Sequence, residues 1–440
     1  MTLTDRHPAA KGRGLRALAG RAGWNLADQA VSSATNLVLS VLAARTLSVD
    51  GFGAFAVAFT VYSFLIAGSR AMIGRPLTVR YPSRGPEKLH AAAQSAAGAT
   101  VLLGFASGIV VAGAGLLLGG ATGSSLVWIG VLMPGLLLQD TWRVVFITEG
   151  RPRAAFINDS LWGVAQLAFV WLFIATHRES AATMLIAWGG AALLVAVFGI
   201  VQFGSRVRIR NSIPWVVAQR DLLKYYLASF IAIMGANQIT LLLIAGLGTP
   251  ADVGAIRAAQ VVLGPLNLLG FALQAFAIPE ISRRQLRGRQ AVRAAAALSA
   301  ILVLADLVWG IALIALPDSL GEVLLGDTWT AAQAVLPASL LGLVAIGAGF
   351  GANALLTALG YARETFWINS MLAPGFLILG LGGLHLGGAP GAALGLALAQ
   401  VVVAPAMWWR AVTLMRRDPA GRPDERLPAD APEDRAGDAS

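Results

Sequence analysis

Long apolar runs dominate the sequence and decide what the chain can fold into. Each run has about 20 largely apolar residues, the length of helix that crosses the hydrocarbon core of a bilayer. Inside that core a helix satisfies all of its own backbone hydrogen bonds, so runs of this length predict membrane-spanning helices. The twelve predicted spans cover residues 23–45, 52–70, 90–118, 124–147, 157–176, 181–203, 222–247, 254–279, 293–316, 331–357, 365–386 and 391–413.

The composition excludes several other classes of protein. Charged residues make up only 13% of the chain, about half their share in an ordinary soluble domain. The net charge of +10 comes from basic residues between the apolar runs, which favours lipid headgroups over nucleic acid as the partner. The chain has no cysteine and only four scattered histidines, so we expect no metal site and no cofactor.

The basic residues also predict the orientation. Of the 33 lysines and arginines, all but Arg45, Arg178 and Arg257 fall on connections that share one side of the membrane. Positive residues stay on the cytoplasmic side, so both termini are predicted to be cytoplasmic. The abundance of arginine over lysine, with much alanine and glycine, is typical of a high-GC bacterial genome. We therefore expect a multi-pass protein of a bacterial plasma (inner) membrane.

Two weak internal matches divide the chain into halves. An offset of 201 aligns Asn36 with Asn237, and an offset of 210 aligns Gly150 with Gly360. We expect a basic cytoplasmic leader (1–22), an N-terminal six-helix bundle (23–211), a C-terminal six-helix bundle (212–417) and a disordered acidic tail (418–440). The predicted fold class is an all-α integral membrane protein with 12 transmembrane helices in two bundles related by pseudo-two-fold symmetry.

Polar residues recur at steps of three or four within spans 1 and 8, which puts them on single helical faces. Such faces avoid lipid, so they contact other helices or water. Hydrogen bonding between helices accounts for any single residue. For the whole stripes we expect a central, water-filled substrate cavity. Span 7 adds Asn237 to these stripes. The candidate cavity residues are Asn25, Gln29, Ser32, Asn36, Asn237, Arg257, Gln260, Asn267 and Gln274.

Charged residues within or beside the spans are candidates for chemistry. Asp306 lies deepest in an apolar run, where a charged carboxylate costs about 3 kcal/mol. It is a candidate ion-coupling site, as is Asp28, or else a structural acid bonded to a neighbouring helix. Guanidinium groups bind phosphate oxygens in pairs, so Arg70, Arg143 and Arg257 are candidate diphosphate ligands, although interfacial snorkelling also explains them.

Three groups of segments carry a family resemblance. They are the polar helix GWNLADQAVSSATNLVLSVLAARTL, the turn SVDGFGAFAVA with its echo TPADVGAIRAA, and RVVFITEGRPRAAFINDSLW with its echo LLTALGYARETFWIN. Residues 20–415 resemble the polysaccharide-transport branch (O-antigen/polysaccharide exporter type) of the multidrug/oligosaccharidyl-lipid/polysaccharide (MOP) flippase superfamily. The resemblance implies two bundles around a cavity that opens alternately to either side. It also implies flipping of a polyprenyl-diphosphate-linked oligosaccharide to the outer leaflet for cell-surface polysaccharide biosynthesis.

Other functions remain open. A multidrug and toxin extrusion antiporter would use Asp28 or Asp306 to accept protons. A non-transporting scaffold would assemble glycosyltransferases through its loops and tail. A membrane glycosyltransferase is the least favoured, because no catalytic motif stands out and the connections between spans are short. If the chain is a flippase, its partners include the bilayer, the lipid-linked substrate, and a polysaccharide polymerase or glycosyltransferases.

Overall fold

The computed structural model describes residues 8–248, 250–325 and 329–417, and within these ranges the regular structure is helical throughout. The predicted tail 418–440 and the first seven residues of the predicted leader lie outside the described residues. The rest of the leader is part of α1 (Pro8–Thr46), which continues without a break into the first predicted span.

The chain divides into two compact units, and the first extends to Gln219. After α1 come α2 (Val49–Ser69), the π-helix η1 (Arg70–Gly74) and α3 (Arg75–Arg80). Helices α2, η1 and α3 follow one another without a break and form one continuous helix. The rest are α4 (Pro86–Leu118), α5 (Gly120–Thr148), α6 (Pro152–Ala175), α7 (Ala181–Phe203) and α8 (Ser212–Ala218). Helix α8 packs on α4, so this unit continues past residue 211, where we expected the first bundle to end.

The second unit begins at Arg220. It contains α9 (Arg220–Leu247), α10 (Pro250–Val262), α11 (Gly264–Arg284), α12 (Gly288–Ile314), α13 (Asp318–Leu325), α14 (Trp329–Ala358), α15 (Ala362–Ser370) and α16 (Leu372–Arg417). Helices α10 and α11 are bent by 58° against each other. The φ of +57° at Gly388 breaks α16 into two helical segments.

Each of the twelve predicted spans is helical over nearly its whole length, and its ends extend at most two residues past a helix. The spans 254–279 and 365–386 each run across a break between two helices. By length and hydropathy, eight helices of the described residues can cross a membrane, or nine when α10 and α11 count as one. That count treats Ala362–Arg417, which includes α16, as one helix. Helix α16 nevertheless contains most of the predicted span 365–386 and all of the predicted span 391–413. The expected all-helical membrane architecture is therefore confirmed, whereas the cytoplasmic orientation of the termini stays a prediction.

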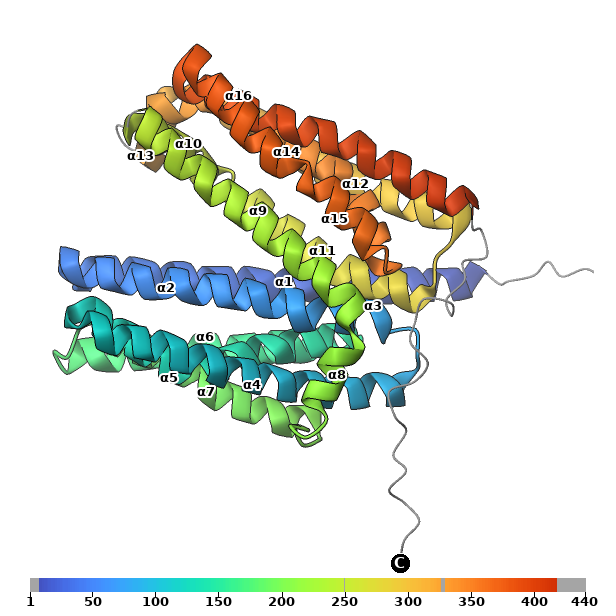
Figure 1. The fold of residues 1–440 in the computed structure, drawn as a ribbon, viewed down its shortest axis with the longest axis horizontal. Coiled ribbons are helices and arrows are strands. Elements are labelled where there is room, and N and C mark those ends of the chain that lie inside the picture. The colour runs from blue at the N-terminus through green and yellow to red at the C-terminus, as the bar shows by residue number, and fades with distance from the viewer. Residues whose placement is uncertain (1–7, 249, 326–328, 418–440) are drawn as a thin grey trace, which may run out of the picture. The chain divides into compact units, whose positions relative to one another are not determined.

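The two units repeat the same pattern of neighbours. In the first unit α5 is central and contacts α2, α4, α6 and α7, which run beside it (Figure 1). In the second unit α14 contacts α10, α11, α12 and α16. The turns that follow these central helices also match, because Gly150 and Gly360 have φ of +80° and +78°. The glycines aligned by the sequence offset thus end equivalent helices in the left-handed conformation that glycine favours.

Candidate functional site

The first unit contains a buried ionic network that joins three of its helices. Arg143 on α5 donates from Nε to Oδ2 of Asp28 on α1 at 2.7 Å, and from Nη2 to Gln29 at 2.7 Å. Its Nε also lies 3.6 Å from Oδ2 of Asp159 on α6. Asp28 is fully buried and Asp159 is 2% exposed. The Arg143 guanidinium thus joins three helices. Its positive charge is buried, and the carboxylates of Asp28 and Asp159 compensate it.

A second ion pair lies one turn away on α5. Arg70 donates from Nε to Oδ2 of Asp140 at 2.9 Å, and its Nη2 contacts the other carboxylate oxygen. Arg70 is the first residue of η1, where the Arg75 amide bonds to the Arg70 carbonyl five residues earlier. Such π-bulges are frequent at functional sites. The Arg70 side chain remains 47% exposed while Asp140 is buried.

The network carries more acidic than basic groups. Three aspartates, Asp28, Asp140 and Asp159, face two arginines, Arg70 and Arg143. Gln139 adds a hydrogen bond to Asp159 at 2.7 Å. The sequence predicted both arginines as ligands of a diphosphate, but the structure has each of them bound to carboxylates. A phosphate that bound Nε of either arginine would therefore displace an aspartate.

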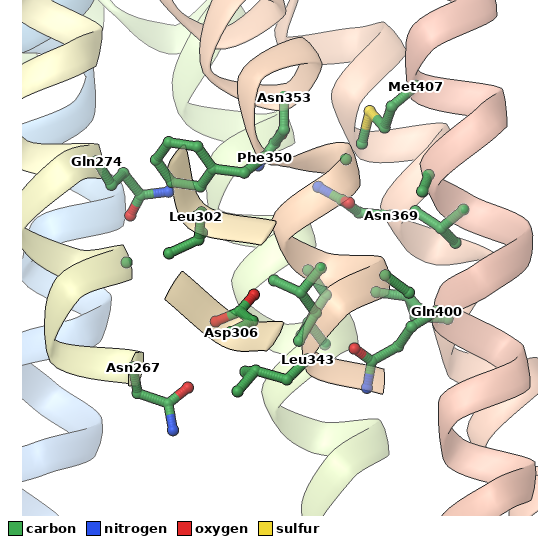
Figure 2. Close-up of a pocket in the computed structure, with 18 of the residues that line it drawn as sticks. Asn267, Gln274, Leu302, Asp306, Leu343, Phe350, Asn353, Asn369, Gln400 and Met407 are labelled. Atoms are coloured by element: carbon green, nitrogen blue, oxygen red, sulfur yellow. The ribbon is translucent and has the colours of Figure 1, made fainter. Parts of the chain in front are cut away.

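The second unit contains an open cavity of about 520 Å³, lined by residues of α9, α11, α12, α14, α15 and α16. Amide side chains line it on several sides, and Figure 2 shows Asn267 and Gln274 on one side of Asp306 and Gln400 on the other. The six lining amides are Asn237, Asn267, Gln274, Asn353, Asn369 and Gln400. Apolar side chains, including Phe271, Phe350 and Phe376, complete the wall.

Asp306 is the one charged residue among those that line this cavity. It is 1% exposed, and neither carboxylate oxygen has a hydrogen-bond partner in the described part of the chain. Oδ1 of Asn353 and Oε1 of Gln400 are likewise buried without a partner there. A buried carboxylate without a partner is costly, so the cavity is a place where a ligand, a proton or water is strongly favoured.

The structure brings together only some of the predicted cavity residues. Asn237, Asn267 and Gln274 line the cavity of the second unit with Asp306. The stripe of span 1 belongs to the first unit, where Asn25 and Ser32 are buried. Gln29 of that stripe binds Arg143, and Asn36 keeps a buried oxygen without a described partner.

Arg257 and Gln260 are not among the residues that line the cavity of the second unit. They are exposed on α10 and bond to each other at 3.3 Å. The periodicity that grouped them with Asn267 and Gln274 assumes one straight helix. The 58° bend between α10 and α11 breaks that register.

Sequence reasoning missed several site residues. Asp140 and Asp159 lie within apolar runs as Asp306 does, and that feature alone could have identified them. Asn353, Asn369 and Gln400 are isolated amides on three different helices, and no spacing within one helix predicts that they meet.

The comparisons with known proteins identify the fold. No family model matches the chain, and no curated protein matches it either. Solved structures do match over nearly the whole length. A MATE transporter in a straight conformation has 13% sequence identity and a TM-score of 0.74, covering 91% of this chain and 96% of that one.

Two further structures give the same result. An outward-facing multidrug resistance MATE family transporter of the MOP superfamily has 12% identity and a TM-score of 0.71, covering 91% of this chain and 96% of that one. A Vibrio cholerae MATE transporter has 17% identity and a TM-score of 0.69, with coverages of 91% and 97%. The chain therefore has the twelve-helix, two-lobe fold of MATE transporters. At this level of identity the likeness defines the fold alone.

Proposed function

We propose that the chain is a membrane transporter that moves its substrate by exposing a polar interior alternately to the two sides of the bilayer. The fold shared with MATE transporters supports this, as do the repeated arrangement of helices and the polar interiors of both units. Buried polar groups within spans are expensive and usually mark a substrate or ion pathway.

For the substrate, we propose a polyprenyl-diphosphate-linked oligosaccharide flipped toward the outer leaflet. The observation that carries this proposal is the cavity wall of six amides and one carboxylate in the second unit. Amides both donate and accept hydrogen bonds, which matches the hydroxyl groups of a saccharide. The phenylalanine rings in the same wall suit the apolar faces of sugar rings, while the polyprenyl tail stays in lipid.

Arg70 is the best diphosphate ligand among the three predicted arginines. Its side chain is half-exposed, and its Nη1 has no hydrogen-bond partner among the described residues, so it can reach a phosphate while still bound to Asp140. Arg143 is only 11% exposed and already binds Asp28 and Gln29. Arg257 does not line the cavity of the second unit, and it bonds to the exposed Gln260.

The test is transfer of a labelled polyprenyl-diphosphate oligosaccharide between leaflets of proteoliposomes that contain only this protein. The double variant Asn267→Leu, Gln274→Leu removes two lining amides, and we expect about tenfold slower transfer from the loss of two hydrogen bonds. Gln260→Leu is the matched control, because Gln260 is exposed outside the cavity. Equal rates for the double variant and wild type, in folded protein, would remove the cavity from the substrate path.

A second candidate is ion-coupled antiport of organic cations. The observation that favours it is that Asp306 is the one charged residue in the cavity wall, with no lysine or arginine beside it. A carboxylate in an otherwise neutral cavity attracts a cation or a proton. Efflux of a fluorescent organic cation driven by a proton or sodium gradient, lost in Asp306→Asn, would favour this function. Transport of either substrate would contradict a purely scaffolding role.

A further inference from the structure

The segment that joins the two units has an exposed apolar ridge. Ile209, Ile213 and Val217 recur at steps of four across α8 and the residues before it. Their exposed fractions are 50%, 65% and 54%. These residues lie between α7 and α9, outside the predicted spans. Large exposed apolar side chains at such a place need a partner, because water is an unfavourable neighbour for them.

The opposite face of the segment is fixed to the first unit. Trp215 stacks on Tyr81, with ring centroids 6.2 Å apart, and Gln219 donates to the Tyr81 hydroxyl at 2.9 Å. Arg80 donates from Nη1 to Oε1 of Gln219 at 2.7 Å. These contacts hold α8 in one orientation, so the side chains of the ridge point away from the first unit's contacts with Tyr81 and Arg80.

A contact with α4 holds the start of the segment. The backbone amide of Arg208 donates to the carbonyl of Gln94 at 3.1 Å. Gly98 lies under this contact, and a Cβ there would overlap Oγ of Ser212 and the carbonyl of Arg208. A glycine is thus required for the segment to lie this close to α4.

Positive charge flanks the ridge on both sides. Arg206, Arg208 and Arg210 precede α8 and are exposed, and Arg220 and Lys224 follow it. None of the three leading arginines forms an ion pair with a described carboxylate. Asp221 is the one acidic residue between Arg206 and Lys224. The charge is therefore strongly positive and available to anions.

We propose that residues 206–217 form a docking surface for anionic lipid. The ridge of Ile209, Ile213 and Val217 inserts below the headgroups, and the leading arginines bind the phosphate groups above it. The neighbouring helices α7 and α9 are predicted spans, which keeps this segment at the membrane surface. A helix of seven residues is too short to partition by itself, but its packing on Tyr81 and α4 orders it in advance.

The insertion is tested with a single reporter. The chain has no cysteine, so Ile213→Cys can be labelled uniquely with bimane in the full-length protein. Glu87→Cys, exposed at the start of α4, is the matched control. In phosphatidylcholine vesicles that contain phosphatidylglycerol, we expect brominated lipid to quench the label at residue 213 but not the label at residue 87. Equal, weak quenching of both labels would overturn the proposal.

The charge requirement is tested in the same assay. Arg206→Gln, Arg208→Gln and Arg210→Gln together should lower the ratio of inserted to water-exposed label, by about fivefold per arginine when phosphatidylglycerol is present. Arg289→Gln with Arg293→Gln, exposed at the start of α12, is the control and should leave the ratio unchanged. A ratio that is independent of phosphatidylglycerol would remove anionic lipid as the partner.

Protein could cover the ridge instead of lipid, and detergent solution separates the two cases. Under the proposal, detergent replaces lipid around the ridge, so a brominated detergent quenches the label at residue 213 in monodisperse solubilised protein. Absence of quenching by the brominated detergent would assign the ridge to a protein contact and overturn the proposal. Because Ile213 is 65% exposed, its replacement leaves the core intact, and gel filtration checks the fold of each variant.

Discussion

At the scale of single residues, Arg143 stabilises two buried carboxylates at once. Asp28 and Asp159 lie on α1 and α6, and the guanidinium between them neutralises charges that the membrane interior would otherwise reject. Removing one member of such a group costs more than replacing all of them, because the remaining charges stay buried and unpaired.

We therefore predict that Arg143→Met lowers the free energy of unfolding by about 3–5 kcal/mol. Thermal unfolding in detergent measures the loss. Arg151→Ala is the control, since Arg151 is half-exposed in its pair with Glu149 and its loss should cost less than about 1 kcal/mol. Adding Asp28→Asn and Asp159→Asn to Arg143→Met should recover most of the stability. If Arg143→Met is as stable as Arg151→Ala, the network contributes nothing to folding.

Asp306 differs from the paired Asp28 and Asp159, because its carboxylate has no hydrogen-bond partner among the described residues. We predict that Asp306→Asn leaves stability unchanged or raises it, since the amide removes a buried acid without changing the shape of the side chain. The same variant should reduce transport in proteoliposomes, because it removes the single charged group of the cavity. A large drop in melting temperature would contradict the first expectation and indicate a structural partner.

At the scale of elements, glycines set how closely neighbouring helices approach. A Cβ at Gly108 would overlap the carbonyl of Gly130 between α4 and α5. In α16, a Cβ at Gly395 would overlap the carbonyl of Leu379, so the segments before and after Gly388 pack backbone against backbone. Close packing of this kind is a main source of helix association where water is absent.

Gly395→Ala therefore should destabilise the second unit by about 1–3 kcal/mol through overpacking. Gly382→Ala on the same helix is the control, because open space surrounds the position where its Cβ would lie. That control should be neutral or slightly stabilising. Melting curves of the two purified variants give the comparison, and equal melting temperatures would show that the two segments can separate without cost.

At the scale of the whole molecule, orientation follows from the distribution of charge. The basic connections predict that Glu87 lies on the cytoplasmic side and Arg178 on the other. Both residues are exposed, and the chain has no cysteine of its own.

We predict that Arg178→Cys reacts with a membrane-impermeant maleimide on intact cells, whereas Glu87→Cys reacts only after permeabilisation. The cysteine-free parent is the control for background labelling. The reverse labelling pattern would contradict the predicted orientation and would place both termini outside the cell.

The fold class could be read from the sequence because the bilayer leaves few choices. A run of about 20 apolar residues becomes a helix to satisfy its own backbone, so all twelve predicted spans are mainly helical, although a break interrupts 254–279 and another interrupts 365–386. The repeat was also visible, since Gly150 and Gly360 occupy equivalent left-handed turns. The sequence also showed that Asp306 lies deep within a span, because it is a single charged residue in a long apolar run.

Only the tertiary structure decided which polar residues meet. Asp28, Arg143 and Asp159 come from three helices, and packing between helices, not spacing within one, brings them together. The same holds for Asp306 and the amides of its cavity. The bend between α10 and α11 separated Arg257 from Asn267, although one straight helix would have aligned them. Sequence periodicity describes one helix at a time, whereas a site depends on crossings between helices that are far apart in the chain.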